Sequence, residues 1–291
     1  MNQTVMRLQD YDIETRYRAV VVSSERITSD ESDEDVRELV LDIDRPDFPY
    51  ELGQSIAAIV PTGPPLEAKQ QVRLYSVADL PERNPAGRPR IKIAVRRCFT
   101  IDERTGARRP GLVSNYLCDL RPGHTIEVCG PFGIPFEVPQ EPEATLILIA
   151  TGTGIAPFRA FVKHIYRNVP GWKGKVWLFY GGKTGLDLLY MNDKNDDFAQ
   201  YCDEETFEAF KALSPRPAWS DPIAWDHVIA QRSDQLWEML SSPTTRVYVA
   251  GLEQMRDELD LVFSAVAGAK ESWQRRKAEL MDAGRWVELL Y

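Results

Sequence analysis

Three side chains in the run Arg73-Leu74-Tyr75-Ser76 suit a ligand that carries phosphates and a flat ring system. A guanidinium group can pair with a pyrophosphate through two hydrogen bonds, and a tyrosine ring can stack on a heterocycle. The serine hydroxyl can bond a ring nitrogen. An edge strand with an exposed tyrosine would show the same residues, so the run by itself leaves both interpretations open.

A glycine-rich segment, Thr151-Gly152-Thr153-Gly154, follows the apolar run Leu146–Ala150 and precedes a predicted helix. Glycines let the backbone approach a phosphate closely, and the first turn of a helix offers unpaired N–H groups at the positive end of its dipole. Pro157 suits that first turn. The spacing is not GxGxxG, and a purely structural turn would have the same composition.

Basic residues are concentrated between Arg83 and Arg109, in a chain whose net charge is −9. This segment contains only two acidic residues, Asp102 and Glu103, and nine basic ones. The basic residues are Arg83, Arg88, Arg90, Lys92, Arg96, Arg97, Arg104, Arg108 and Arg109. A basic region on an acidic protein can steer an acidic partner to one face, whereas a solvated charged surface has the same composition. The overall negative charge argues against nucleic acid as a partner.

The composition is typical of a globular chain with two domains. At 291 residues and 43% hydrophobic content, the chain can bury a core in each domain. Its apolar runs are far shorter than the ~20 residues that span a bilayer, and the polar N-terminus lacks the apolar region of a signal peptide, so we expect a cytoplasmic protein. The cysteines form no CxxC pair, so we expect buried free thiols and no metal site at Cys98, Cys118, Cys129 and Cys202.

The first half of the chain predicts a small antiparallel barrel. Short runs rich in Val, Ile and aromatic residues alternate with turns that contain Pro, Gly and Asp, as in closed antiparallel sheets. The predicted strands are Val36–Ile43, Ser55–Val60, Val72–Val77, Ile91–Cys98 and Thr125–Cys129. We expect residues 1–34 to form a loosely held lead-in, and Ser114–Leu120 to form one or two helical turns.

The second half predicts apolar strands that alternate with amphipathic helices. The predicted strands are Thr145–Ala150, Lys175–Tyr180, Thr206–Leu213, Arg246–Gly251 and Trp286–Leu290. This alternation indicates right-handed crossovers and a five-stranded parallel, doubly wound sheet. Helical spacing after Gly251 predicts a buried face made of Leu252, Met255, Leu259, Val262 and Val266. A cluster of Pro, Gln and Glu at 139–143 separates a barrel domain at 35–138 from a second domain at 144–291.

Taken together, these segments resemble the plant-type ferredoxin–NADP reductase family. Its hallmarks are RLYS in a flavin-binding barrel and GTGTGIAPFR at the start of a nucleotide-binding domain, and they correspond here to Arg73–Ser76 and Thr151–Arg159. Further similar segments follow in the same order: Gly111–Leu120, Gly130–Gly133, Leu186–Tyr190, Leu236–Leu240, Gly251–Leu252 with Met255, and Trp286–Tyr291. The resemblance covers roughly residues 35 to 291.

The resemblance implies an FAD site in the barrel. Arg73 would pair with the pyrophosphate, Tyr75 would stack on one face of the isoalloxazine ring, and the Ser76 hydroxyl would lie near the flavin N5. Further contacts implied for FAD are Phe99 at the adenine and Val113 and Ser114 at the phosphates. Arg96 and Arg97 could also hold the FAD phosphates, because they sit next to a predicted strand.

The resemblance also implies a site for a nicotinamide dinucleotide in the second domain. Its residues would be Thr151, Gly152, Thr153, Gly154, Gly251, Leu252 and Met255. The ring of the terminal residue, Tyr291, would cover the other face of the flavin and yield to the nicotinamide. Glu288 would orient the nicotinamide or relay protons, while hydride passes directly to flavin N5. Ser76, Glu288 and Tyr291 are therefore the residues expected at the reacting atoms.

The chain departs from the family pattern at two places. Ala250 stands where the family has a cysteine beside the nicotinamide, and the 2′-phosphate site is reduced to Ser214 and Arg216 without the following Lys and Tyr. Trp225 could stack on the adenine in place of that Tyr. Asp226, if it points inward, would repel a 2′-phosphate or accept a bond from a 2′-hydroxyl. Despite these departures, the resemblance favours NADPH over NADH as the dinucleotide substrate.

The predicted function is that of a ferredoxin–NADP reductase-like flavoenzyme. It would use FAD and NADP(H) and exchange single electrons with a separate acidic carrier, ferredoxin or flavodoxin, docked near Arg83–Arg109. One alternative is the NADH-using reductase component of a multicomponent oxygenase or aromatic-degradation system. Another is a flavin-bearing module that binds nucleotide without efficient turnover.

Overall fold

The computed structural model describes residues 13–62, 69–102, 104–133, 139, 141–202, 204–219 and 221–291. By its internal contacts the chain divides into two compact units. The barrel unit holds the described residues up to 133 together with 156–164, and the parallel-sheet unit holds the rest. No helix within the described residues is both long and apolar enough to cross a bilayer.

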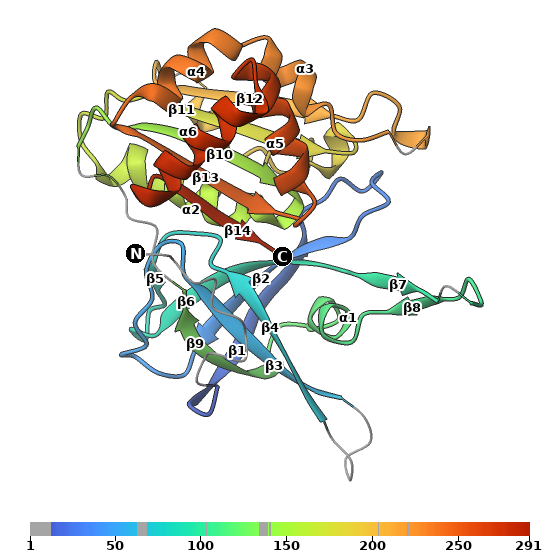
Figure 1. The fold of residues 1–291 in the computed structure, drawn as a ribbon. Helices are drawn as coiled ribbons and strands as arrows, with labels where there is room; N and C mark the ends of the chain where they lie inside the picture. Colours follow the sequence, from blue (N-terminus) through green and yellow to red (C-terminus); the bar gives the residue numbers. More distant parts are fainter. Residues whose placement is uncertain are drawn as a thin grey trace. The chain divides into compact units, whose positions relative to one another are not determined.

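The barrel unit is built on one antiparallel sheet of seven strands (Figure 1). The strands are β1 (Arg16–Arg26), β2 (Val36–Ile43), β3 (Ser55–Thr62), β4 (Lys69–Ser76), β5 (Glu82–Arg83), β6 (Pro89–Arg96) and β9 (Thr125–Phe132). Their order is β4-β3-β9-β1-β2-β6-β5. A bridge between Val77, just after β4, and Ile93 of β6 joins the two sides of the sheet, so the sheet curves into a barrel.

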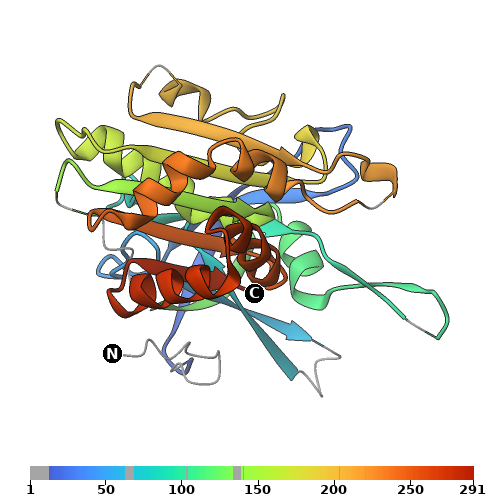
Figure 2. The ribbon, with the colours of Figure 1, turned by 45° about the horizontal axis from the view of Figure 1, so that its top comes forward.

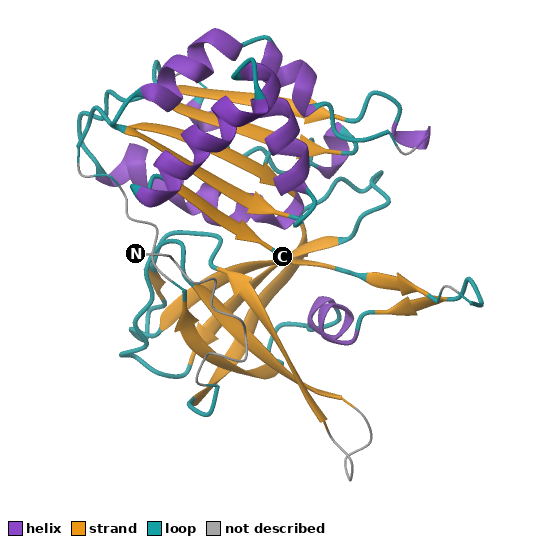
Figure 3. Cartoon of the chain, viewed as in Figure 1, coloured by secondary structure: helices purple, strands orange, loops and turns teal. Residues whose placement is uncertain are grey.

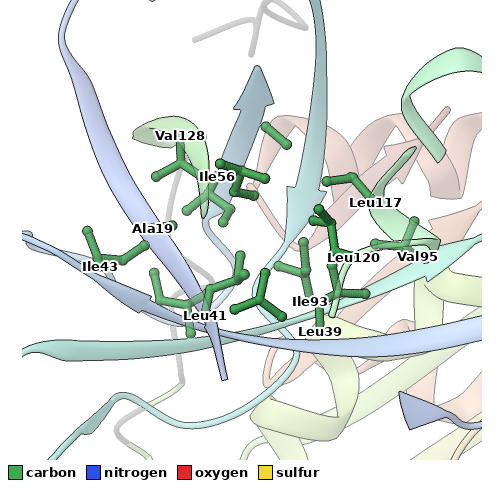
Figure 4. Packing of buried hydrophobic residues seen from close by; sticks show 14 of the residues in the cluster. Ala19, Leu39, Leu41, Ile43, Ile56, Ile93, Val95, Leu117, Leu120 and Val128 are labelled. Atoms are coloured by element: carbon green, nitrogen blue, oxygen red, sulfur yellow. The ribbon is translucent and has the colours of Figure 1, made fainter. Parts of the chain in front are cut away.

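The barrel encloses a core of aliphatic side chains that alternate along the strands (Figure 4). Leu39, Leu41 and Ile43 of β2 are fully buried because every second side chain on a strand points to the same face. A short helix, α1 (Leu112–Cys118), adds Leu117 to this core. The antiparallel barrel predicted from the sequence is confirmed.

The first strand of the barrel lies within the segment that the sequence assigned to a lead-in. β1 pairs with β2 on one side and with β9 on the other, and Ala19 and Val21 are buried in the core. The assignment of residues 1–34 to a loosely held lead-in is therefore wrong from Arg16 onward. The strand was missed because its sequence, RYRAVVVSSER, places charged residues at both ends of a short apolar centre.

A two-stranded hairpin leads from the barrel into α1. It consists of β7 (Phe99–Ile101) and β8 (Arg108–Pro110), which pair only with each other. Figure 2 shows this hairpin extending as an arm, away from the barrel strands. Gly111 N donates to the carbonyl of Cys98, so the base of the hairpin is closed directly before α1 begins.

The second unit is a parallel sheet with strand order β12-β11-β10-β13-β14. The strands are β10 (Thr145–Thr151), β11 (Val176–Gly182), β12 (Phe207–Leu213), β13 (Thr245–Gly251) and β14 (Trp286–Leu290), all parallel to their neighbours. The chain passes from β10 to β11 through α2 (Ile155–Asn168). The five-stranded parallel sheet predicted from the sequence is confirmed.

Four helices cover one face of the parallel sheet (Figure 3). They are α3 (Trp225–Ala230), α4 (Ser233–Ser241), α5 (Met255–Val266) and α6 (Lys270–Asp282). Met255, Leu259 and Phe263 form the buried face of α5. Leu252 precedes the helix and is 38% exposed, so its predicted place in the core is wrong.

A cluster of ionised side chains is buried within the barrel unit. The Asp79 carboxylate lies 2.9 Å from Lys92, 3.1 Å from Arg159 and 3.2 Å from Lys163. Burial alone would raise the pKa of Asp79, but these cations outweigh it and lower the pKa to about 2. The ion pairs fix residues 156–164 on the barrel, because removing either sign would leave a buried charge without its counterion.

Candidate functional site

Three of the predicted flavin residues, Arg73, Tyr75 and Ser76, lie on β4. Arg73 and Tyr75 share one face of the strand, since they are two residues apart. Arg73 is exposed, and its Nη1 donates to the carbonyl of Val72 at 2.8 Å. Tyr75 packs against the barrel core, and burial raises the pKa of its hydroxyl. The Ser76 hydroxyl lies 3.4 Å from that of Ser55.

Large hydrophobic side chains are exposed on several elements of the barrel unit. Leu74, Phe99, Ile101, Leu112 and Tyr116 come from β4, from the β7–β8 hairpin and from α1. The guanidinium carbon of Arg108 lies 3.7 Å from the centre of the Phe99 ring. Exposed apolar area beside cationic groups is what a flat ring system with phosphates would cover. The residues present therefore fit FAD.

The start of α1 is held by local bonds. Cys98 N donates to the Ser114 hydroxyl at 3.2 Å, and Asn115 Nδ2 donates to the Cys98 carbonyl at 2.8 Å. A Cβ at Gly111 would lie only 3.0 Å from Ser114 Oγ, so the close approach favours glycine. Val113 is buried in the barrel core. The structure thus gives Val113 and Ser114 packing and bracing roles, and only their backbone is left to meet a phosphate.

The basic segment is largely neutralised by neighbouring carboxylates. Arg96 makes two hydrogen bonds of 2.7 Å with Glu34, so its guanidinium is already engaged. Six of the nine cations form such ion pairs: Arg88 with Asp44, Arg90 with Asp42, Lys92 with Asp79, Arg96 with Glu34, Arg97 with Asp35, and Arg109 with Asp102. Among the described residues, the other three, Arg83, Arg104 and Arg108, have no carboxylate partner, and Arg83 donates to the backbone carbonyls of Pro46 and Gly87. Two of these three, Arg104 and Arg108, lie on the β7–β8 hairpin.

Glycines bring two loops together at the ends of β10 and β13. A Cβ at Gly154 would lie 2.2 Å from the Ala250 carbonyl oxygen, and one at Gly251 would lie 2.3 Å from Thr151 Oγ1. Gly251 also has φ of 143°, which side chains rarely adopt. Thr151 Oγ1 donates to the Met255 sulfur at 2.9 Å. The hydrogen bond between Thr151 and the buried Met255 therefore connects the segment after β10 to the start of α5.

A buried tyrosine of β11, Tyr180, holds the glycine-rich loop through a hydrogen bond. The Tyr180 hydroxyl donates to the carbonyl of Gly152 at 3.0 Å and accepts a bond from Leu189 N at 3.0 Å. Tyr180 is fully buried, and burial raises the pKa of its hydroxyl. Gly152 itself has φ of 51°. Tyr180 is a functional candidate that sequence reasoning missed, because it reads as an ordinary core residue of β11.

The C-terminal residue is held against the same loops. Tyr291 N donates to the Gly251 carbonyl at 3.0 Å, and its own carbonyl accepts a bond from Glu253 N at 3.2 Å. The Tyr291 hydroxyl shares a short hydrogen bond with the hydroxyl of Thr153. The side chain is nevertheless 62% exposed. The last residue is thus fixed at both its backbone and its hydroxyl, with its ring still accessible.

Glu288 faces the helices and not the loops that carry Tyr291. Its carboxylate accepts bonds from Arg256 and from Trp286 Nε1, each at 2.8 Å, and lies 3.2 Å from Lys277. Burial would raise the pKa of Glu288, but these partners outweigh it and the pKa is lowered. Tyr291 follows directly after β14, and its hydroxyl is bonded to Thr153, which is not among the partners of Glu288. The structure therefore does not bring Glu288 together with Tyr291, which counts against its predicted place at the nicotinamide.

The predicted 2′-phosphate site is rearranged. Trp225 is buried in the sheet core, where a Cβ at Gly181 would lie 2.5 Å from its ring, so its predicted stacking on adenine is wrong. The exposed aromatic side chain of this loop is Trp219, which is 77% exposed. Ser214 is buried, and Arg216 is paired with Asp221. Arg216 and Trp219 are therefore the exposed side chains here that a ligand could meet.

Both units match known domain families. Residues 20–136 match the oxidoreductase FAD-binding domain, and residues 148–260 match the oxidoreductase NAD-binding domain. The class defined by fold and site is thus a flavin-dependent oxidoreductase that joins an FAD barrel to a dinucleotide-binding sheet.

Curated relatives narrow this class to one family. Ferredoxin–NADP reductase from Thermosynechococcus vestitus is 34% identical over 91% of this chain and 70% of its own. The enzyme from a Spirulina species is 32% identical over 95% of both chains, and the root isozyme 1 of Arabidopsis thaliana is 32% identical over 94% and 75%. The chain belongs to the ferredoxin–NADP reductase family.

Solved structures agree on the fold. Ferredoxin–NADP⁺ reductase from Plasmodium falciparum superimposes with a TM-score of 0.69 at 18% identity, over 97% of this chain and 98% of that one. The resemblance inferred from the sequence motifs is therefore confirmed at the level of family and fold.

Proposed function

We propose that this protein is an FAD-dependent ferredoxin–NADP reductase that passes electrons between NADP(H) and a one-electron carrier. The observation that carries the proposal is the similarity to ferredoxin–NADP reductases over nine-tenths of the chain, which includes both domains. These relatives bear the same name, so the oxygenase reductase component considered as an alternative gains no support from them.

The barrel unit would hold FAD. Arg73 would pair with the pyrophosphate, since its guanidinium is exposed and bonded only to a backbone carbonyl among the described residues. Tyr75 would lie along the ring system, and the apolar side chains of Leu74 and Leu112 would exclude water. Phe99 is proposed for the adenine, with Arg108 already stacked on its ring. When bound, FAD accepts an electron pair as hydride and releases electrons singly.

The parallel-sheet unit would hold NADP(H). The loop from Gly152 to Gly154 offers backbone N–H groups at the start of α2, the arrangement that suits a pyrophosphate. Thr153 and Tyr291 would meet the nicotinamide end, because their hydroxyls are bonded to each other and the tyrosine ring is exposed. Arg216 and Trp219 would meet the adenosine end. Glu288 would affect the dinucleotide site only indirectly, by holding β14 in position.

An acidic carrier, ferredoxin or flavodoxin, is proposed to dock on the β7–β8 hairpin. This docking site is narrower than the whole basic segment, because most of that segment is paired with carboxylates. Arg104 and Arg108 supply charge there, and Ile101, 72% exposed, supplies apolar area. Apolar contact framed by complementary charge is typical of such transient electron-transfer interfaces. The expected cytoplasmic location stays a prediction.

The proposal is tested by supplying NADPH, a ferredoxin and cytochrome c as final acceptor. Cytochrome reduction that requires both the protein and the ferredoxin supports the assignment. Flavin reduction without any transfer to ferredoxin or flavodoxin would instead favour a nucleotide-binding module of another role.

A further inference from the structure

The loop after β12 holds an arginine between a carboxylate and an indole ring. Arg216 Nε donates to Asp221 at 2.8 Å, and Nη2 lies 3.4 Å from the second carboxylate oxygen. The guanidinium carbon of Arg216 lies 6.0 Å from the centre of the Trp219 ring. The loop begins at the carboxyl end of an edge strand, and parallel sheets bind ligands outside these ends.

The carboxylate is the fixed member of this pair. The buried Ser214 hydroxyl donates to the backbone carbonyl of Asp221 at 2.8 Å, which ties that residue to the end of β12. The Asp221 side chain is 21% exposed, whereas that of Arg216 is 69% exposed. The guanidinium can therefore turn toward a ligand, while the carboxylate stays close to it.

The charge of Asp221 distinguishes two kinds of ligand. An exposed ion pair is itself weak, so Arg216 can leave it at little cost. The carboxylate that remains would repel a phosphate dianion bound by Arg216, by roughly tenfold in affinity for a separation of about 6 Å in a water-like dielectric. A 2′-hydroxyl is uncharged and would feel no such repulsion.

We propose that Asp221 is a specificity determinant, which competes with the 2′-phosphate for Arg216 and so lowers the preference of this chain for NADPH over NADH. The inference rests on the proposed function for its dinucleotide substrate. Asp226, to which sequence reasoning gave this role, is exposed on α3, and no contact between described residues joins it to Arg216. It therefore serves as a matched control.

Calorimetric titration with 2′-phospho-AMP and with 5′-AMP tests the proposal without requiring flavin turnover. Asp221→Asn should tighten binding of 2′-phospho-AMP about tenfold and change binding of 5′-AMP by less than about twofold. Asp226→Asn removes the same charge nearby and should change neither affinity by more than about twofold. Arg216→Gln should weaken 2′-phospho-AMP selectively.

Three results would overturn the proposal: equal affinity of Asp221→Asn and the unaltered protein for 2′-phospho-AMP, a parallel change for both nucleotides, or no effect of Arg216→Gln. Absence of binding in both the unaltered protein and Asp221→Asn would overturn it too. Transfer of electrons to ferredoxin is measured separately. A chain that follows the predicted binding pattern but transfers no electrons contradicts the proposed function and leaves this inference standing.

Discussion

Two residues three positions apart, Glu288 on β14 and Tyr291 just after it, have different surroundings. Tyr291 lies against the glycine-rich loops, whereas Glu288 lies among Arg256, Lys277 and Trp286 on the helix side of the sheet. The sequence shows both residue types near the chain end but says little about which face each occupies, because a strand inverts the face with every residue. Residue type alone therefore misplaced Glu288.

The ring of Tyr291 is predicted to compete with nicotinamide for the flavin. Tyr291→Ser should lower the ratio of kcat/KM for NADPH to kcat/KM for NADH by up to about tenfold. One aromatic stacking contact contributes up to about 1.5 kcal/mol, and 1.4 kcal/mol corresponds to about a tenfold change. Tyr291→Phe keeps the ring and loses only the bond to Thr153, so it should stay within about twofold. Equal changes in both specificity constants for Tyr291→Ser would contradict the stacking role.

Glu288 is predicted to stabilise the fold and to contribute little to hydride transfer. Glu288→Gln should lower the free energy of unfolding by about 1–3 kcal/mol, since it weakens a partly buried network of charged hydrogen bonds. The lowered pKa means that this stabilisation is present above the ordinary Glu range and is lost as pH falls through the folded-state value. Urea unfolding across pH measures this. A large loss of the hydride-transfer rate in a stably folded variant would contradict this role.

At the scale of elements, strands and loops differ in how well the sequence specifies them. All five strands of the parallel sheet were predicted to within two residues at each end. The central strands β10, β11 and β13 are the clearest, because strands buried on both faces are nearly continuous apolar runs. β1 was missed because its apolar centre is flanked by charges. The loop after β12 was misassigned because the sequence cannot tell which of two tryptophans enters the core, and only packing against Gly181 decides for Trp225.

The loop between β10 and α2 is predicted to depend on Tyr180 of β11. Tyr180→Phe removes the bonds to Gly152 and Leu189 without opening a cavity. The KM for NADPH should rise severalfold, because the loop loses its fixed carbonyl, while the flavin spectrum stays unchanged. A buried group left unpaired costs about 1–3 kcal/mol. An unchanged KM would show that the loop keeps its position without this hydroxyl.

The β7–β8 hairpin is predicted to determine the rate of encounter with an acidic carrier. Charge reversal at Arg104, which has no part in the proposed FAD site, should slow reduction of ferredoxin severalfold at low ionic strength, and the difference should shrink above ~0.1 M salt, where the Debye length is about 10 Å. Arg88→Glu is a matched control, because Arg88 is already paired with Asp44. Ferricyanide, which needs no docking, should be reduced equally well by all variants.

Two results would contradict this docking site. An equal loss of ferredoxin and ferricyanide reduction would indicate damage to the flavin site. An effect of Arg88→Glu as large as that of the hairpin variant would place the docking surface on the barrel strands instead.

At the scale of the whole molecule, the order of domains carries the assignment. An antiparallel barrel is followed by a five-stranded parallel sheet, and each matches the domain family expected of it. Fold class and family were predictable because several motifs recur in the same order along the chain. Particular site residues were less predictable, because their roles depend on which neighbours neutralise or bury them.

The most direct test of the account is anaerobic mixing of the purified holoprotein with NADPH, followed through the visible absorption of the bound flavin. We expect one FAD per chain, released intact on denaturation, whose absorption band is bleached rapidly by NADPH and restored on addition of oxidised ferredoxin. A protein that binds no flavin, or whose FAD stays oxidised with both NADPH and NADH, would contradict it.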